Sequence, residues 1–290
     1  MKILVTGTAG QLGRELVLML QAAGEEVVGI DQQELDLSRT DEVAAGIANY
    51  GVDWVINCAA YTQVDKAEED RELAFLINRD SAGAVAIGVK RCRGRLVHIS
   101  TDFIFDGKQS RPYKEDDVAN PLGVYGQSKL EGEQLVHKVM PEAIILRTAW
   151  VYGIHGHNFV KTMLRLAAER EELNVVDDQI GTPSWTADIA SAIQTLINRN
   201  AAGTYHFTNE GVASWYDFAD SIVHIARDLD FPIKAKIVKP IPSSEFPTPA
   251  TRPPYSVLNK QKIRNLLDRD IPHWQQSLEQ MLRQLQGNAE

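Results

Sequence analysis

The sequence is poor in cysteine, with two such residues among 290, Cys58 and Cys92. Their spacing matches no metal-ligand pattern, which argues against a metal site built on cysteine. Both stand beside apolar, strand-like stretches, where a free cysteine behaves as a small apolar residue. We therefore expect two buried, reduced thiols.

Long apolar runs and an excess of positive charge are also missing. No run approaches the roughly 20 apolar residues that span a bilayer, and the chain opens with a strand pattern instead of the charged and then apolar segment of a secretory signal. The 30 Lys and Arg are outnumbered by 39 Asp and Glu, giving a formal net charge of -9. Because an acidic surface repels nucleic acids and anionic membranes, we expect a cytoplasmic protein that binds neither. An anionic ligand then needs a local basic pocket.

A glycine-rich turn opens the chain. The apolar run at residues 3–5 is followed by Gly7, Gly10 and Gly13, and apolar residues then recur at helical spacing up to Leu20. This pattern predicts a strand, a tight turn and a helix. Glycine suits the turn because it adopts backbone angles that other residues resist, and because a diphosphate must come close to the main chain at the helix N-terminus. A plain connecting turn in another α/β protein is the alternative.

The first half of the chain then alternates strands with helices. Apolar, strand-like runs occur at 26–31, 53–58, 95–100 and 143–148, and helical patterns lie between them, at 41–50 and 68–90 among others. Such alternation predicts a parallel sheet with right-handed crossovers, an α/β fold of the Rossmann-type, doubly wound class. In these folds ligands bind outside the carboxyl ends of the strands.

Residues after about 150 break this rhythm. Helices are expected at 158–169, 186–199, 215–228, 259–267 and 272–285, strands at 173–176 and 203–207, and no regular helix in the proline-rich stretch 231–254. We expect residues 1–150 to form an NAD(P)-binding domain whose sheet is completed by later elements. Residues 151–290 are expected to form mainly a smaller substrate-binding lobe, interleaved with that sheet.

Two strand ends carry candidate cofactor residues. The second strand ends at Asp31, and an acid in this position accepts hydrogen bonds from the adenosine ribose and repels a 2'-phosphate, which favours NADH. A helix cap or turn role for Asp31 is the alternative. Asp36 and Leu37 could meet the adenine by a hydrogen bond and an apolar contact. Small residues before Tyr61, past the third strand, let a cofactor approach the backbone.

Three further residues form a candidate catalytic set. Tyr125 and Lys129 are four residues apart, so on a helix both lie on one face. Free tyrosine titrates near pH ~10 and a nearby ammonium favours the phenolate, so Lys129 is expected to lower the pKa of Tyr125. Thr101 ends the fourth strand, at the same edge of the sheet as the glycine turn, where its hydroxyl can bond a substrate oxygen. A chance YxxxK pair and an ordinary strand-end threonine are the alternatives.

Longer motifs narrow the family. They are GTAGQLG, NCAAYTQVDKAE, STDFIFDG, YGQSKLEGE, RTAWVYG, NFVKTMLRLA, DQIGTPSW and RPPYSVL. On these motifs the chain resembles the extended short-chain dehydrogenase/reductases and, within them, the family of dTDP-4-dehydrorhamnose reductases, almost from end to end. The glycine turn and the YxxxK pair mark the superfamily, whereas the later motifs are much narrower.

The resemblance implies roles for individual residues. The cofactor site comprises Gly7, Gly10, Gln11, Leu12, Gly13, Asp31, Asp36, Leu37, Ala60, Tyr61, Thr62, Tyr125 and Lys129, with Lys129 holding the ribose. The sugar nucleotide faces Thr101, Asp102, Tyr125 and Trp150. Apart from the resemblance, the second half of the chain carries cations that could bind a phosphorylated substrate, among them Lys161, Arg165, Lys239 and Arg252. A solvated surface position is the alternative for most of them, and Arg252 is included in the substrate site. Phe103 stands where the family has tyrosine, and Ser128 where threonine is usual.

The implied activity is the reduction by NADPH or NADH of the C4 keto group of dTDP-4-dehydro-L-rhamnose. The product is dTDP-L-rhamnose, and the reaction is the last step of dTDP-rhamnose biosynthesis. Tyr125 supplies the proton to O4 and Thr101 bonds that oxygen. The resemblance also makes a homodimer and a magnesium ion possible, without identifying ligands for the metal.

Other activities fit the same fold. A further nucleotide-sugar reductase or an epimerase would use the same catalytic residues, and a non-catalytic regulatory subunit could share the whole fold. A 4,6-dehydratase is expected to carry an acid directly after Thr101 and Asp102, where this chain has Phe103. Dehydration is therefore disfavoured.

Overall fold

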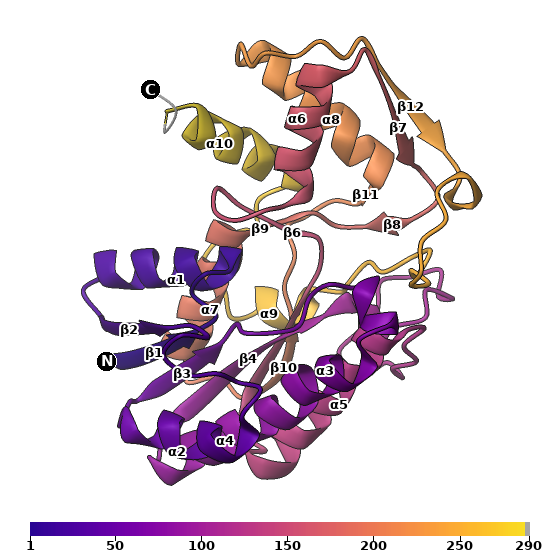
Figure 1. Ribbon diagram of the computed structural model, residues 1–290. Helices are drawn as coiled ribbons and strands as arrows, with labels where there is room; N and C mark the ends of the chain where they lie inside the picture. The colour runs from indigo at the N-terminus through magenta and orange to yellow at the C-terminus, as the bar shows by residue number, and fades with distance from the viewer. Residues whose placement is uncertain (288–290) are drawn as a thin grey trace.

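A six-stranded parallel sheet forms the larger lobe in the computed structural model, which describes residues 1–287 (Figure 1). The strand order is β10-β5-β4-β3-β1-β2, and every neighbouring pair is parallel. The strands are β1 (Lys2–Thr6), β2 (Glu26–Ile30), β3 (Trp54–Asn57), β4 (Arg95–Thr101), β5 (Ile144–Thr148) and β10 (Gly203–His206). The prediction of a Rossmann-type, doubly wound α/β fold is confirmed.

Helices cover both faces of this sheet. They are α1 (Gln11–Ala22) and α7 (Thr186–Asn198) on one face, and α2 (Thr40–Asn49), α4 (Ser81–Arg91) and α5 (Val124–Val139) on the other. Successive strand residues point to opposite faces, so Ile3 and Val5 are buried toward α1 and α7, and Leu4 is buried toward α2 and α4. Because both faces are covered, the strands are apolar along almost their whole length.

A smaller lobe follows directly from the end of β5 (Figure 1). Its helices are α6 (Phe159–Glu169), α8 (Trp215–Asp228) and α10 (Trp274–Gly287), and its short strands pair as β6 (Val151–Tyr152) with β9 (Ser184–Trp185), β8 (Ile180–Gly181) with β11 (Ala213–Ser214), and β7 (Glu172–Val176) with β12 (Ile237–Ile241). Aromatic rings dominate its core, among them Phe159, Phe218 and Trp274. The chain returns from this lobe to the main sheet through α7 and β10, so elements from both halves of the sequence build the sheet.

The helix expected at 68–90 is confirmed from Arg71 onward, but it is not a uniform α-helix. A 3-10 turn, η1 (Lys66–Glu68), precedes it, and α3 (Arg71–Phe75), a π-helical turn, η2 (Leu76–Asp80), and α4 then follow one another without a break. The wider turn has a packing reason, because the Asn78 amide bonds both the N–H and the carbonyl of Tyr61, at 2.8 and 3.0 Å. Isolated π turns of this kind occur often beside functional sites.

One smaller expectation fails. The helix expected at 259–267 is reduced to one turn, α9 (Gln261–Arg264). Strand β12 forms inside the proline-rich stretch because it pairs with β7, a contact that the local sequence does not carry. The remaining short elements are the 3-10 turns η3 (Asp102–Ile104) and η4 (Ser243–Glu245). By contrast, Ser214 caps α8 in a capping box with Asp217, as its sequence position suggests.

A buried ion pair fixes α5 on the sheet. Arg147 of β5 is 7% exposed and Glu133 of α5 is 3% exposed. The guanidinium donates to both oxygens of Glu133, from Nη2 at 2.7 Å and from Nε at 3.0 Å, and from Nη1 to the Glu115 carbonyl at 3.1 Å. A buried pair of this kind tolerates loss of one partner badly, because the other charge is then left without compensation.

The Glu133→Gln substitution is expected to lower the free energy of unfolding by about 3 kcal/mol, because it leaves the Arg147 charge buried and uncompensated. Urea titration measures the change. Glu131→Gln is the matched control, since Glu131 lies on the same helix but forms a partly exposed pair with Arg79, and its loss should cost less than about 1 kcal/mol. Equal effects of the two substitutions would contradict a special role for the buried pair.

Candidate active site

A cavity of about 390 Å³ opens at the carboxyl ends of β1, β2 and β3. Of the residues expected to hold a cofactor, it is lined by Gly7, Asp31, Asp36, Leu37, Ala60 and Tyr61. The sequence did not single out Gln32, Leu35, Ser38, Gln63, Leu73 or Ile77, which also line it. Gly10, Gln11, Leu12, Gly13 and Thr62 do not line this cavity.

The glycine turn has no room for side chains. Gly7 has φ +71°, and a Cβ placed on it would lie 2.8 Å from the Ala59 nitrogen. A Cβ on Gly13 would lie 2.3 Å from the Gly7 carbonyl oxygen, so the first turn of α1 sits directly against the loop. The Gly10 N–H donates to the Gly7 carbonyl at 3.0 Å. This bare main chain at a helix N-terminus fits the diphosphate of a dinucleotide.

Asp31 has two structural contacts at the rim of the same cavity. One carboxylate oxygen accepts from the Ala9 N–H in the glycine turn, and the other accepts from the Gln32 N–H at 2.8 Å. The carboxylate therefore stabilises the turn as well as facing the cavity. Within residues 1–287, neither Lys nor Arg lines this cavity, whereas Asp31 and Asp36 both do.

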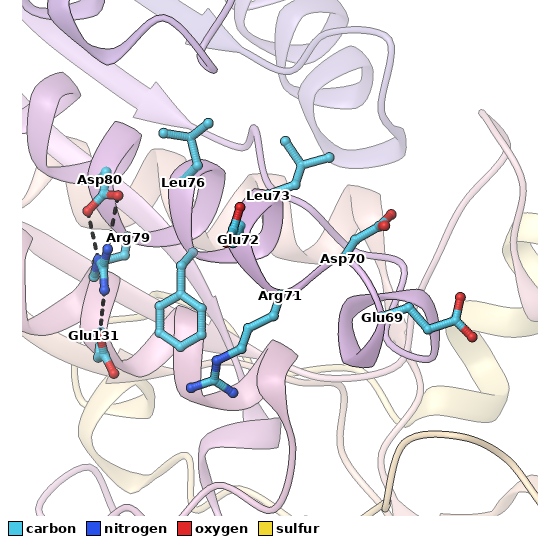
Figure 2. Close-up of a pocket in the computed structure, with 10 residues that line it drawn as sticks. Glu69, Asp70, Arg71, Glu72, Leu73, Leu76, Arg79, Asp80 and Glu131 are labelled. Carbon is cyan, nitrogen blue, oxygen red and sulfur yellow. Dashed lines mark hydrogen bonds and ion pairs between the residues drawn. The ribbon is translucent and has the colours of Figure 1, made fainter.

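A larger cavity, about 1130 Å³, lies elsewhere, along α3 and η2 (Figure 2). It is lined mainly by charged residues, and Arg79 is already paired there with Asp80 and Glu131. Arg71 and Arg79 lie over the ring of Phe75, 4.8 and 5.0 Å from its centroid. Thr101, Tyr125 and Lys129 line neither cavity. None of the expected cofactor residues lines the larger one, whereas six of them line the smaller one, so the smaller cavity is the better candidate for the cofactor site.

Thr101 and Tyr125 meet beside the end of β4. Thr101 is 6% exposed, and its hydroxyl donates to the Asp102 carboxylate at 3.1 Å. The nearby Thr101 hydroxyl favours the phenolate of Tyr125 and so lowers its pKa. Phe103, which stands in place of the usual tyrosine, packs edge-on against Tyr125 with ring centroids 5.6 Å apart.

Lys129 belongs to α5, the helix that also carries Tyr125, and its side chain is buried. Its ammonium donates to the Ile99 carbonyl at 2.7 Å, and burial lowers the pKa of Lys129 to about 8. Burial also raises the pKa of Tyr125 to about 12, against the smaller opposing effect of Thr101. The expectation that Lys129 lowers the pKa of Tyr125 is therefore wrong in this arrangement, because the ammonium is held at Ile99 and desolvation of the phenol dominates.

Asp102 is a buried acid next to this pair. It is 1% exposed, and burial raises the pKa of its carboxyl to about 6, although Ser256 and Thr101 favour the ionised form. In the described part of the chain its Oδ2 has no hydrogen-bond partner. An unpaired carboxylate oxygen in a buried position has a free acceptor for a ligand hydroxyl.

Two residues that the sequence analysis missed hold α5 in place. The Glu68 carboxylate accepts from the Val124 N–H at 2.8 Å and so caps the helix that carries Tyr125. The Asn78 amide donates to Ser128 at 3.0 Å, and Ser128 donates to the Tyr125 carbonyl at 2.8 Å. Glu68 lies within the motif NCAAYTQVDKAE, but the hydrogen bond depends on a contact between distant segments.

Trp150 has an unusual backbone. Its φ is +46°, in the left-handed region that costs a non-glycine residue about 1 to 2 kcal/mol. The indole stacks on Trp215 with centroids 3.6 Å apart, and a Cβ on Gly181 would lie 2.6 Å from its ring. The surroundings therefore fix this side chain at the start of the smaller lobe, and strained residues of this kind cluster at ligand sites.

The four candidate cations all have protein partners. Arg252 binds Asp65 through two hydrogen bonds of 2.9 and 2.8 Å, and this contact lowers the pKa of Asp65. Lys161 donates to the carbonyls of Ile154 and Gly156, while Arg165 pairs with Glu169 and Lys239 with Glu172. A phosphorylated ligand would have to compete with these partners.

Other expectations concern metals, thiols and membranes. Among residues 1–287, no three or more His, Cys, Asp or Glu side chains gather where they could hold a metal ion. Both cysteines are free, but they are partly exposed instead of buried. The helices described in the structure are all too short or too polar to cross a membrane.

Asp102→Asn is expected to stabilise the protein in a pH-dependent way. A folded-state pKa of about 6, above the ordinary value of 3.8, means that the folded protein holds more protons than the unfolded chain between these values, so this carboxyl destabilises the fold as pH rises. The gain from Asn should therefore be near zero at pH 4 and reach about 2 to 3 kcal/mol at pH 7. Urea titrations across this range test it, and a pH-independent difference would contradict it.

Comparison with known proteins identifies the family. The model of the RmlD substrate binding domain matches residues 1–287. The chain is 41% identical to a dTDP-4-dehydrorhamnose reductase of Burkholderia thailandensis, over 98% of this chain and 99% of that protein. It is 40% identical to a dTDP-4-keto-6-deoxy-D-glucose reductase of Streptomyces niveus, over 96% of this chain and 95% of that protein. The crystal structure of a Bacillus anthracis dTDP-4-dehydrorhamnose reductase in complex with NADP superimposes with a TM-score of 0.92 at 38% identity, covering 98% of this chain and 99% of that chain. With this agreement over nearly the whole length, the chain belongs to the dTDP-4-dehydrorhamnose reductase family.

Proposed function

We propose that this protein reduces the C4 keto group of dTDP-4-dehydro-L-rhamnose with a nicotinamide cofactor, giving dTDP-L-rhamnose. The observation that carries the proposal is the meeting of Thr101 and Tyr125 at the end of β4, with Lys129 one turn further along α5. The set lies at the same edge of the sheet as the bare glycine turn. Two free thiols and an acidic composition suit a cytoplasmic enzyme.

The cofactor would be held by the cavity at the ends of β1 to β3 and by the glycine turn. Asp31 and Asp36 would bond the adenosine end, and the N-terminus of α1 would receive the diphosphate, with Gly10, Gln11, Leu12 and Gly13 forming its first turn. Bound there, NADH or NADPH supplies the hydride that adds to C4.

Tyr125 is the proton donor in this proposal. The alkoxide that forms at O4 on reduction has a basicity near that of hydroxide and is a much stronger base than a phenolate. A phenol with a pKa of about 12 stays protonated at every physiological pH and still gives its proton to that oxygen downhill. Thr101, whose hydroxyl lies near Tyr125, would bond the same O4.

Lys129 and the smaller lobe complete the site. With a pKa of about 8, the ammonium is mostly charged at pH 7, and the protons it does not give to Ile99 can bond the cofactor ribose. The free Oδ2 of Asp102 and the fixed indole of Trp150 would orient the sugar. Residues 151–290 would thus act mainly as the substrate-binding part, and Arg252 would join it by exchanging Asp65 for a substrate phosphate.

The Tyr125→Phe variant is expected to lose NADH oxidation in the presence of dTDP-4-dehydro-L-rhamnose by at least about 100-fold, because it keeps the ring and removes the proton. Absorbance at the nicotinamide band measures the rate. Tyr50→Phe, at the end of α2 and away from the site, is the control and should keep the parental rate. Full activity of Tyr125→Phe would exclude Tyr125 as the donor.

We further propose that NADH is preferred to NADPH, because Asp31 and Asp36 line the cavity without a balancing cation. Asp31→Asn keeps the size of the side chain and removes its charge, so it should reduce the ratio of kcat/KM for NADH over NADPH by about tenfold. Asp36→Asn is the parallel variant that tells which carboxylate discriminates. A wild-type preference for NADPH would overturn this proposal.

A second candidate substrate is the C4 keto sugar of the opposite sugar series, on which the Streptomyces niveus relative acts by its name. The catalytic set would serve either sugar, since both reactions add a hydride to C4 and a proton to O4. Parallel assays with dTDP-4-keto-6-deoxy-D-glucose distinguish the two. An epimerase would show no net consumption of NADH with either substrate.

A further inference from the structure

A loop of the smaller lobe, residues 153–158, lies on the first turn of α1. The Asn158 amide nitrogen donates to the Gln11 side-chain oxygen at 2.9 Å. Gly156, with φ +62°, lies so near that a Cβ on it would be 3.1 Å from Cγ of Gln11. These contacts join a helix of the nucleotide-binding lobe to a loop that belongs to the other lobe.

Asn158 has a fixed amide orientation. Its Oδ1 accepts from the Lys161 N–H at 3.0 Å, as the N-cap of α6. Because a backbone N–H can only donate, the oxygen must be on that side, and Nδ2 must face the other two partners, the Gln11 oxygen and the Gly153 carbonyl at 2.8 Å. One side chain therefore fixes the start of α6, the loop and Gln11 together.

Further contacts hold the loop in place. Lys161 donates to the carbonyls of Ile154 at 2.7 Å and Gly156 at 3.1 Å. A Cβ on Gly153 would lie 2.3 Å from Thr186 Oγ1, at the start of α7. A displacement of Gln11 must therefore displace the loop and the whole of α6 as well.

Gln11 is the first residue of α1, directly after the glycine turn. The N–H groups at this helix end are those that an anionic diphosphate would occupy. A ligand that orders this end of α1 would also order Gln11. We propose that Asn158 is a positioning residue that couples the two lobes, so that a nucleotide bound at the glycine turn strengthens binding of the sugar nucleotide in the smaller lobe.

The nature of the two ligands rests on the proposed function, but the coupling does not depend on turnover. Coupling between two sites is reciprocal, so each nucleotide must raise the affinity for the other by the same factor. NADH and dTDP, which cannot react with each other, are suitable probes. Isothermal titration calorimetry of NADH, alone and with saturating dTDP, gives the factor directly, and about tenfold is expected for the wild type.

The test uses Asn158→Asp and Asn158→Ser. Both residues are good N-caps and keep an acceptor for the Lys161 N–H, so α6 should still form. Both lose the two amide donations, and Ser does so without adding charge. The coupling factor should fall from about ten to below about two, while the unfolding temperature changes little.

Thr162→Ala is the matched control. Thr162 donates to the Asn158 carbonyl at 2.9 Å within the same turn of α6, so its loss weakens the helix start without touching Gln11. It should leave the coupling factor unchanged. In a Gln11→Ala background, Asn158→Ser should have no further effect.

Three results would overturn the proposal: no coupling in the wild type, full coupling in both Asn158 variants, or equal loss of coupling in Thr162→Ala. Failure of the proposed function looks different. In that case the wild type binds NADH but does not oxidise it with either keto sugar, whatever the coupling factor is.

Discussion

The position of α5 on the sheet is the constraint on which the site depends, and the buried pair of Glu133 and Arg147 sets it. Two charges taken out of water are costly unless their hydrogen bonds are met, and here the guanidinium bonds the carboxylate and a carbonyl. Such a pair tolerates little sliding or rotation of the helix. Since Lys129 lies one turn before Glu133 and Tyr125 two turns before it, the same pair places both at the sheet edge.

Burial of this edge has a common electrostatic effect. It raises the pKa of Tyr125 and Asp102 and lowers that of Lys129, in each case toward the uncharged form. Asp102 and Lys129 are thereby brought to titrate near neutral pH, whereas Tyr125 stays protonated. A phenol that stays protonated is an acid ready for use, and an ammonium that titrates near neutrality can respond to a bound cofactor.

Local sequence patterns predicted most of the fold. The glycine turn and the apolar strands are each fixed by neighbours within a few residues, so the sequence predicted them. The π turn at Asn78, the strand β12 and the cap that Glu68 gives to α5 depend on partners far along the chain. The expected effect of Lys129 on the pKa of Tyr125 was wrong for a further reason. Helical spacing fixes the face of the helix on which a side chain lies, but it does not fix the acceptor that the side chain binds there.

The two lobes have separate hydrophobic clusters, one on each face of the sheet and another around the aromatic rings of α6, α8 and α10. Several contacts that cross between segments of the two lobes are polar, including Gln11 with Asn158 and Asp65 with Arg252. Polar contacts exchange partners at lower cost than a packed apolar interface, since water or a ligand can replace either partner. A nucleotide-sugar phosphate that displaces Asp65 from Arg252, or a dinucleotide that orders Gln11, would therefore act on the relative placement of the lobes without disturbing either core.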